Sequence, residues 1–448
     1  MSLSLFGRSK PVCGAASTRG AAASTPDTEP FSPTVPALPP QPQPQAQRAG
    51  LVTYSWLLDP RKQIIGYRLR WQPRAGAAAD DGQALQALVT AVADALVHRE
   101  RGWLLGKSGL MFDMTLEAAL RGIDWGRLPA RNIVLCWSGA DFGRPEALPV
   151  LQALRAEGFG IMVSGELPDE AAVRELITHF DVGTGDAAAL ATCRSIARRP
   201  VHPVATGMAD WSGFDACASR RVPVLVPPAV PTPQDASPRG PLQPQTLLVV
   251  RLLQMVQRNE DVREIEAALK HDAALTYRLL HHINSPAVGA GVQIQSLRHA
   301  VAMLGYSRLF RWLSVLLMTT DVKSSPPFLM KKAIVRGRFV ELLGQGLLGA
   351  KHADNLFLVG MFSVMDQLLR LSMTELLERV QLEDAVQLAI LGNGGVYGPF
   401  LELALACEAG AERAGDLVDG LFMSESQANA AHLAAVTWAQ EISRSEVT

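Results

Sequence analysis

The chain has 448 residues, 48% of them hydrophobic and 19% charged, so about two or three domains with ordinary cores are expected. A formal net charge of −1 gives no overall attraction to nucleic acid or to an anionic membrane. Five scattered cysteines without CxxC spacing argue against a disulfide framework or a zinc ribbon. No apolar run approaches the roughly 18 residues of a membrane span, and the first residues do not form a signal peptide, so we expect a cytoplasmic protein.

Residues 1–49 are rich in Pro, Ala and Gln, and we expect a disordered tail because they have little apolar mass to bury. Over residues 50–222 we predict a barrel of alternating strands and helices. Its first two strands are LVTYSWLLD and QIIGYRLRWQ, and a helix is predicted over 81–99. The buried runs GLMFDMT, NIVLCWS and FGIMVSG follow, separated by helical segments that include 168–180.

Eight prolines fall between Pro223 and Pro244, so residues 223–245 are predicted to be a linker without helix or central strand. Apolar residues at helical spacing then continue over 246–442, which predicts an all-α bundle. Within it, Ser296 is a candidate N-cap and Gly305 a candidate left-handed helix end. Asn284, followed by Ser285 and Pro286, should end a helix.

The helical half resembles the HDOD domain, a relative of the HD phosphohydrolases found in bacterial signalling proteins. Two segments carry the resemblance, and they are KHDAALTYRLLHHINSP and IQSLRHAVAMLGYSRLFRWL. The first half is similar to a degenerate EAL domain, the barrel of cyclic-di-GMP phosphodiesterases. The resemblance therefore implies a two-domain EAL–HDOD signalling protein, with a degenerate (β/α) EAL-like barrel before an all-α HDOD helical bundle.

An EAL phosphodiesterase holds two divalent metals with carboxylates and an Asn at the barrel mouth. The resemblance places its signature Glu at Arg68 and its Asn at Asp113, and it places later carboxylates at Cys136, Ser164 and Gly165. The regions FDVGTGD and ATGMA lack the family's Lys and Glu residues. One remaining carboxylate cannot hold two cations, so we expect this barrel not to hydrolyse cyclic-di-GMP.

The pair His271–Asp272 has the letters of an HD metal site, but it lies at the start of a helix where the family has no metal. The resemblance places a working HD pair within FLVGMFSVMDQL, and there this sequence has Ser363–Val364 instead. His281 and His282 are adjacent, so on a helix they point about 100° apart and cannot easily face one metal. We therefore expect no metal site among these residues.

A cluster of basic residues either binds an acidic partner or forms the solvated face of two helices, and its members are Arg308, Arg311, Lys331, Lys332, Arg336 and Arg338. Trp312 is expected in the core or at an interface. The glycine-rich GNGGVYG segment over 392–398 is interpreted as a turn between helices rather than a phosphate loop, because no strand precedes it.

The sequence thus favours a non-catalytic adaptor in cyclic-di-GMP-linked regulation, acting through protein–protein contacts of both domains. The alternative is a residual cyclic-di-GMP phosphodiesterase or an HD-type metal-dependent phosphohydrolase. We expect the chain not to be an enzyme, and we name no catalytic, cofactor-binding or metal-binding residue and no cofactor. The expected partners are other bacterial signalling proteins, with no nucleic acid and no membrane span.

Overall fold

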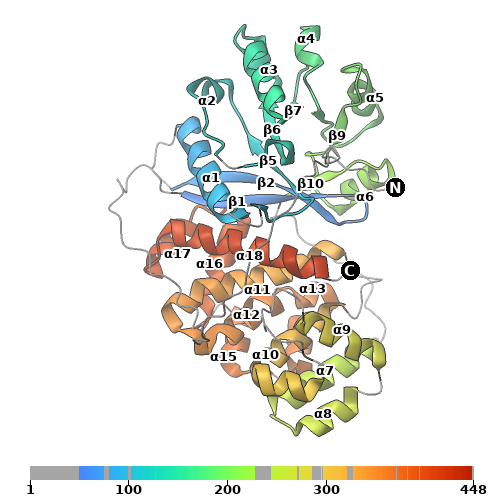
Figure 1. The fold of residues 1–448 in the computed structure, drawn as a ribbon, viewed down its shortest axis with the longest axis vertical. Helices are drawn as coiled ribbons and strands as arrows, with labels where there is room; N and C mark the ends of the chain where they lie inside the picture. Colours follow the sequence, from blue (N-terminus) through green and yellow to red (C-terminus); the bar gives the residue numbers. More distant parts are fainter. Residues whose placement is uncertain are drawn as a thin grey trace, which may run out of the picture.

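A computed structural model describes most of the chain after the tail. The described residues are 50–74, 80–98, 102–126, 128–227, 244–269, 272–284, 294, 296–319, 326–369, 371–380, 382–392 and 394–445. The expected disordered tail over 1–49 lies outside them. Figure 1 shows a barrel-like domain above a bundle of helices, with α16, α17 and α18 lying between the barrel strands and the other helices.

Eight strands form one sheet in the order β10-β1-β2-β5-β6-β7-β8-β9. The first two, β1 and β2, form an antiparallel hairpin, and the neighbours β2, β5, β6, β7, β8 and β9 run parallel. A bridge between Ala205 and Val224 joins the two ends of the sheet, so the predicted barrel is confirmed as a nearly closed one. The strands are β1 (Gly50–Leu58), β2 (Ile64–Pro73), β5 (Gly109–Asp113), β6 (Ile133–Ser138), β7 (Gly160–Ser164), β8 (His179–Asp181), β9 (His202–Val204) and β10 (Val224–Val226).

Strand β10 lies inside the segment expected to be a linker, so that expectation is wrong at its start. Trp56 of β1 pairs with Val226, and the Leu225 N–H donates to the Ala205 carbonyl oxygen at 2.8 Å. The prolines flank this strand rather than interrupt it, because Val224–Val226 lies between Pro223 and Pro227. The barrel therefore extends to Val226, beyond the start of the expected linker.

Helices cover the outside of the barrel and make short connections between its strands. The predicted helix over 168–180 is wrong for most of its length, because only Ala171–Arg174 is helical and β8 takes the end of the segment. The elements around the main sheet are α1 (Asp81–Leu96), β3 (Val97–His98), β4 (Gly102–Trp103), α2 (Leu116–Arg121), η1 (Ala130–Asn132), η2 (Gly139–Gly143), α3 (Ala147–Glu157), α4 (Ala171–Arg174), α5 (Ala187–Ser195) and α6 (Trp211–Ser219).

The second half is helical, as predicted. Its elements are α7 (Pro244–Gln257), α8 (Val262–Leu269), α9 (Ala273–Ile283), α10 (Leu297–Thr319), α11 (Pro327–Leu348), η3 (Ala350–His352), α12 (Ala353–Phe362), α13 (Met365–Leu369), α14 (Met373–Val380), α15 (Asp384–Gly392), α16 (Gly398–Ala409), α17 (Ala414–Gly420) and α18 (Glu425–Ser445). None of the described helices is long and apolar enough to cross a membrane.

Ser296 and Asn284 have the expected structural roles, whereas Gly305 has a positive φ but an extended ψ rather than the expected left-handed helical conformation. The Ser296 hydroxyl accepts a hydrogen bond from the His299 N–H at 3.1 Å, at the start of α10. Gly305 interrupts α10 with φ 77° and ψ 171°, which a residue with a side chain rarely adopts. Asn284 follows the end of α9, and its side chain both donates to and accepts from the backbone of Ile294.

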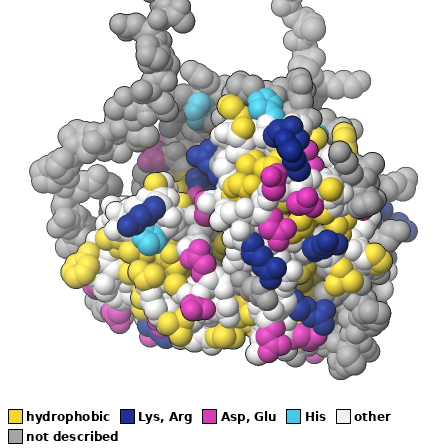
Figure 2. Space-filling model, turned by 90° about the horizontal axis from the view of Figure 1, so that it is seen from below, with side chains coloured by type: hydrophobic (Ala, Val, Ile, Leu, Met, Phe, Trp, Pro, Cys, Tyr) yellow, Lys and Arg dark blue, Asp and Glu magenta, His cyan; other side chains and the backbone are white. Residues whose placement is uncertain are grey.

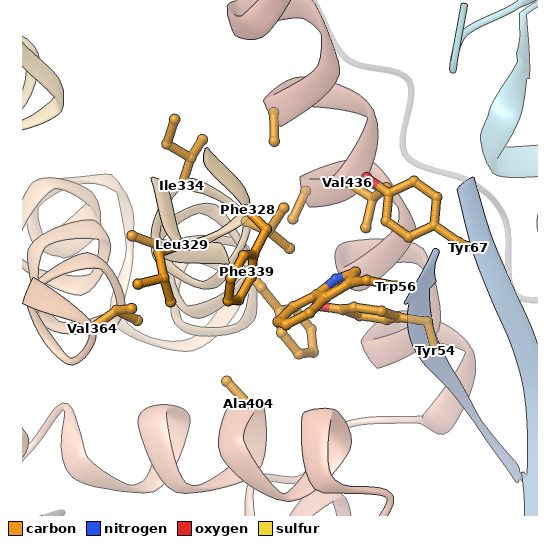
Figure 3. Close-up of a cluster of buried hydrophobic side chains, with 14 of the residues drawn as sticks. Tyr54, Trp56, Tyr67, Phe328, Leu329, Ile334, Phe339, Val364, Ala404 and Val436 are labelled. Carbon is orange, nitrogen blue, oxygen red and sulfur yellow. The ribbon is translucent and has the colours of Figure 1, made fainter. Parts of the chain in front are cut away.

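The outer face of β1 packs against the helical bundle through aromatic side chains. Figure 3 shows Tyr54 and Trp56 pointing from β1 toward Phe328 and Phe339 of α11. Trp56 lies 5.6 Å from Phe328, measured between ring centroids. The Asn429 amide of α18 adds two hydrogen bonds to β1, accepting from the Val52 N–H and donating to the Gly50 oxygen. The barrel and the bundle therefore share one continuous core.

Candidate functional site

The barrel interior is apolar at its middle and polar where the parallel strands end. A small core fills the middle, formed by Leu57, Met111, Val134, Cys136, Met162, Val204 and Leu225. Arg68 pairs with Met111 in the register between β2 and β5, and Asp113 pairs with Cys136 between β5 and β6. The carboxyl ends of parallel barrel strands are where such folds place their sites. We call this polar end the barrel mouth.

Two arginines hold the Asp113 carboxylate at the barrel mouth. The Arg68 Nε donates to Asp113 Oδ1 at 2.7 Å, and the Arg70 Nε donates to Asp113 Oδ2 at 2.8 Å. Burial lowers the pKa of the Arg68 guanidinium, but attraction to Asp113 and the hydrogen bond to it outweigh burial and leave that pKa raised. Arg68 is therefore a fixed positive charge inside the mouth.

Sequence reasoning missed a second polar group at the mouth, formed by Asp181 and Thr206. The Thr206 hydroxyl donates to Asp181 Oδ2 at 2.5 Å, and the Gly183 N–H donates to Asp181 Oδ1 at 2.9 Å. The available signal was the acidic residue at the end of the run HFD, directly before the glycines of VGTG. Asp181 is also close enough to help raise the pKa of Arg68.

The residues at the mouth do not fit a cage for two divalent cations. Burial raises the pKa of the Cys136 thiol to about 12, and a neutral thiol is a poor metal ligand. The Asp113 oxygens already accept from two guanidinium groups. Across the ranges that the structure describes, no three or more His, Cys, Asp or Glu side chains gather closely enough to hold a metal ion.

Asp272 and His281 have separate structural contacts at the two ends of α9. The Asp272 carboxylate caps the helix, accepting from the Leu275 N–H at 2.9 Å. His281 lies against the Tyr277 ring, with the two rings nearly parallel and 5.8 Å apart. His271 and the His282 side chain lie outside the described residues.

A second polar cluster lies in the bundle, where the HD pair was expected. Arg336 and Glu408 form a bidentate ion pair with distances of 2.8 and 2.6 Å, and they are only 4% and 5% exposed. The Arg336 guanidinium also donates to the Ser363 hydroxyl at 2.8 Å. Ser363 thus binds an internal arginine.

Most of the predicted basic cluster is internal, so both interpretations of it are wrong for these members. Lys331, Lys332 and Arg336 are buried. Arg311 makes a bidentate pair with Glu341 at 2.8 and 2.7 Å. Glu341 and Glu408 offset the cost of burying the charges of Arg311 and Arg336. Lys331 donates instead to the side-chain oxygen of Gln440. Trp312 is buried in the core, as expected.

Burial displaces the pKa of several groups around the Arg336–Glu408 pair. Burial and then repulsion by Arg336 lower the pKa of Lys332 to about 8. Burial raises the pKa of Asp366. The pKa of Glu408 would also rise on burial, but attraction to Arg336 lowers it. A titratable cluster therefore lies beneath the barrel.

His432 connects this cluster to β1, and its ring is stacked on Phe339 and next to Tyr54. Burial lowers the pKa of His432 from 6.5 to about 4.

As the pH falls from about 7 to about 5, His432 of the unfolded chain takes up a proton that His432 of the folded protein does not. The free energy of unfolding should therefore fall by about 2 kcal/mol between about pH 7 and about pH 5 from this group. Urea unfolding at both pH values should show a smaller fall in His432→Gln, and an equal fall would contradict this assignment.

Comparisons with known proteins support the bundle assignment. Residues 241–386 match the HDOD domain. The chain is 31% identical over 163 residues to cyclic di-GMP phosphodiesterase CdgJ of Vibrio cholerae, which covers 36% of this chain and 38% of the relative. It is 27% identical over 161 residues to YuxH of Bacillus subtilis, covering 35% and 39%. An HDOD domain protein structure from Geobacter sulfurreducens has a TM-score of 0.29 and 18% identity, covering 37% and 72%.

The family match over 241–386 confirms the HDOD domain, and the Vibrio relative corrects one expectation. The expectation that the chain is not an enzyme is contradicted, because the Vibrio relative is named as a phosphodiesterase. The earlier expectation rested on the loss of the EAL and HD metal ligands at their family positions. That loss does not exclude activity that uses other residues of the chain. The alignment spans well under half of each curated relative.

Proposed function

Because an HDOD domain follows the barrel, we propose that this chain is a signalling protein of cyclic-di-GMP regulation that acts through contacts with other proteins. The name of the Vibrio relative supports the link to cyclic-di-GMP. In this proposal the dinucleotide binds at the barrel mouth, and the bundle contacts a partner protein in response to that binding. The domain assignment of 1–49 as tail, 50 to the end of β10 as barrel and 246–442 as HDOD bundle is part of the same proposal.

One observation carries this proposal: the hairpin of β1 and β2 has one face toward the barrel mouth and the opposite face toward the bundle. Arg68 lies at the barrel mouth, while the preceding residue, Tyr67, is buried on the opposite face beside Tyr54. Successive side chains of a strand point to opposite faces. Any ligand that moves Arg68 therefore acts on a strand that contacts the bundle.

The chemistry of the mouth suits a phosphodiester. Guanidinium groups pair with phosphate oxygens through two parallel hydrogen bonds. Arg68 and Arg70 already hold the carboxylate of Asp113, with Arg68 on one of its oxygens and Arg70 on the other. A phosphate of the dinucleotide would compete with that carboxylate, which would change the position of Arg68.

A calorimetric titration of the full chain with cyclic-di-GMP tests this assignment. Arg68→Gln should weaken binding by about tenfold or more, because it removes a charge-assisted hydrogen bond donor. The matched control is Arg251→Gln, which removes an exposed arginine from α7. Equal affinities of the native protein and Arg68→Gln, or no binding at all, would reject the mouth as the binding site.

Hydrolysis of cyclic-di-GMP is a second candidate function, supported by the named activity of the Vibrio relative. Incubating the full chain with cyclic-di-GMP and Mg²⁺ or Mn²⁺ and following the linear product tests it. Turnover that is lost in Asp113→Asn would assign the activity to the barrel mouth. Turnover that persists in this variant would place the activity elsewhere in the chain.

A further inference from the structure

The turns at the amino-terminal edge of the barrel carry a concentration of arginines. Strands β6 to β9 are parallel neighbours, so the turns that lead into them lie at one edge of the sheet. Every one of these four turns, or the last helical turn before it, contains at least one arginine. We call this the basic edge, and its members are Arg131, Arg155, Arg174, Arg194, Arg198 and Arg199.

Few carboxylates balance the basic edge. Only Asp124, Glu157 and Glu175 lie in the same described turns, against six arginines, and Glu175 is already 4.0 Å from Arg198. The sequence from residue 187 to residue 209 contains no Asp or Glu. The edge therefore keeps an excess of positive charge, although the whole chain has a net charge of −1.

Two of the guanidinium groups are held in place by the backbone. Arg155 donates to the Phe159 carbonyl oxygen, and Arg174 donates to the Pro168 carbonyl oxygen, both at 2.5 Å. Burial lowers the pKa of Arg155, and repulsion by Arg199 lowers it further. Two positive charges are thus held close together, and their mutual repulsion is unfavourable. A bound anion would offset that repulsion.

The basic edge is accessible and lies away from the bundle. Arg198 is 96% exposed, and Arg131 and Arg199 are also exposed. In Figure 1 the helices α3, α4 and α5 lie on the side of the barrel opposite the bundle. The far end of the bundle is different, since Figure 2 shows basic, acidic and apolar side chains interspersed there.

We propose that the basic edge binds an acidic segment of a partner protein. Neighbouring strands are about 4.8 Å apart, so four strands present arginines over about 15 Å, the length of a short peptide segment. Carboxylates pair bidentately with guanidinium groups. A nucleic acid fits less well, because such domains typically have a pI above about 9 and this chain has a pI of 6.8.

Fluorescence anisotropy with labelled octaglutamate tests the basic edge. The full chain should bind this peptide, and the affinity should fall as salt is added, since exposed charges are screened. Arg198→Glu combined with Arg199→Glu should weaken binding by about tenfold or more. Arg251→Glu plus Arg263→Glu, the matched control on exposed positions of the bundle, should stay within about twofold of the native affinity.

Thermal melting shows whether the double variant is folded, and Arg131→Glu replaces it if it is not. Absence of octaglutamate binding, or equal binding by native and folded edge variants, would overturn the proposal. Tighter binding of a single-stranded oligonucleotide than of octaglutamate would also overturn it, in favour of a nucleic acid. The basic edge and the barrel mouth lie at opposite ends of the parallel strands, so failure here leaves the cyclic-di-GMP proposal standing.

Discussion

Replacing Glu408 with Gln should destabilise the protein by about 3–5 kcal/mol, because the charge of Arg336 would remain buried without its partner. Both side chains are almost inaccessible to water, and the ion pair is bidentate. A loss of this size is a large part of the roughly 5–15 kcal/mol that stabilises a typical domain. Urea unfolding followed by circular dichroism measures it.

The control is the double variant Arg336→Met with Glu408→Leu. Replacing both charges with apolar groups of similar size removes the buried charge itself, so the double variant should be more stable than Glu408→Gln. If the single variant unfolds at the same urea concentration as the native protein, the ion pair does not stabilise the fold as described.

Phe328→Ala should cost about 3–5 kcal/mol, because it empties a packed space between the two halves of the molecule. The Phe328 ring lies 5.6 Å from Trp56 and 5.1 Å from Trp211, which both belong to the barrel. The loss should therefore loosen the barrel and the bundle together. Chemical unfolding should show a lower midpoint by circular dichroism and by tryptophan fluorescence alike.

Phe422→Ala is the matched control, because that ring is 93% exposed and the same atoms are removed. It should change stability by no more than about 0.5 kcal/mol. An equal effect of the two substitutions would show that the aromatic contact between β1 and α11 is not what joins the domains.

The fold could be predicted where local patterns are long. The hairpin of β1 and β2 and the helices of the bundle have clear periodicity. Strands β8 and β10 have only three residues each, which is too short for an alternation to be recognised. Their pairing depends on neighbouring strands that close the barrel, so their positions are set by tertiary contacts.

The candidate site was predictable only in part. The family pattern located Arg68, Asp113 and Cys136 at the ends of neighbouring strands, and they do lie together. It did not indicate that Arg336 is internal, because its partner Glu408 is 72 residues away in the sequence. Spacing within one helix identifies a face, but it does not tell which distant carboxylate covers that face.

Hydrogen–deuterium exchange of the full chain, with and without cyclic-di-GMP, tests the proposed link between mouth and bundle most directly. Binding at Arg68 should slow exchange in β2. It should also change exchange in α18, which packs on β1, and in α11, whose Phe328 contacts Trp56 of β1. Exchange that changes in β2 but stays the same in both helices would contradict transmission to the bundle. Unchanged exchange throughout the chain at saturating dinucleotide would contradict the binding site itself.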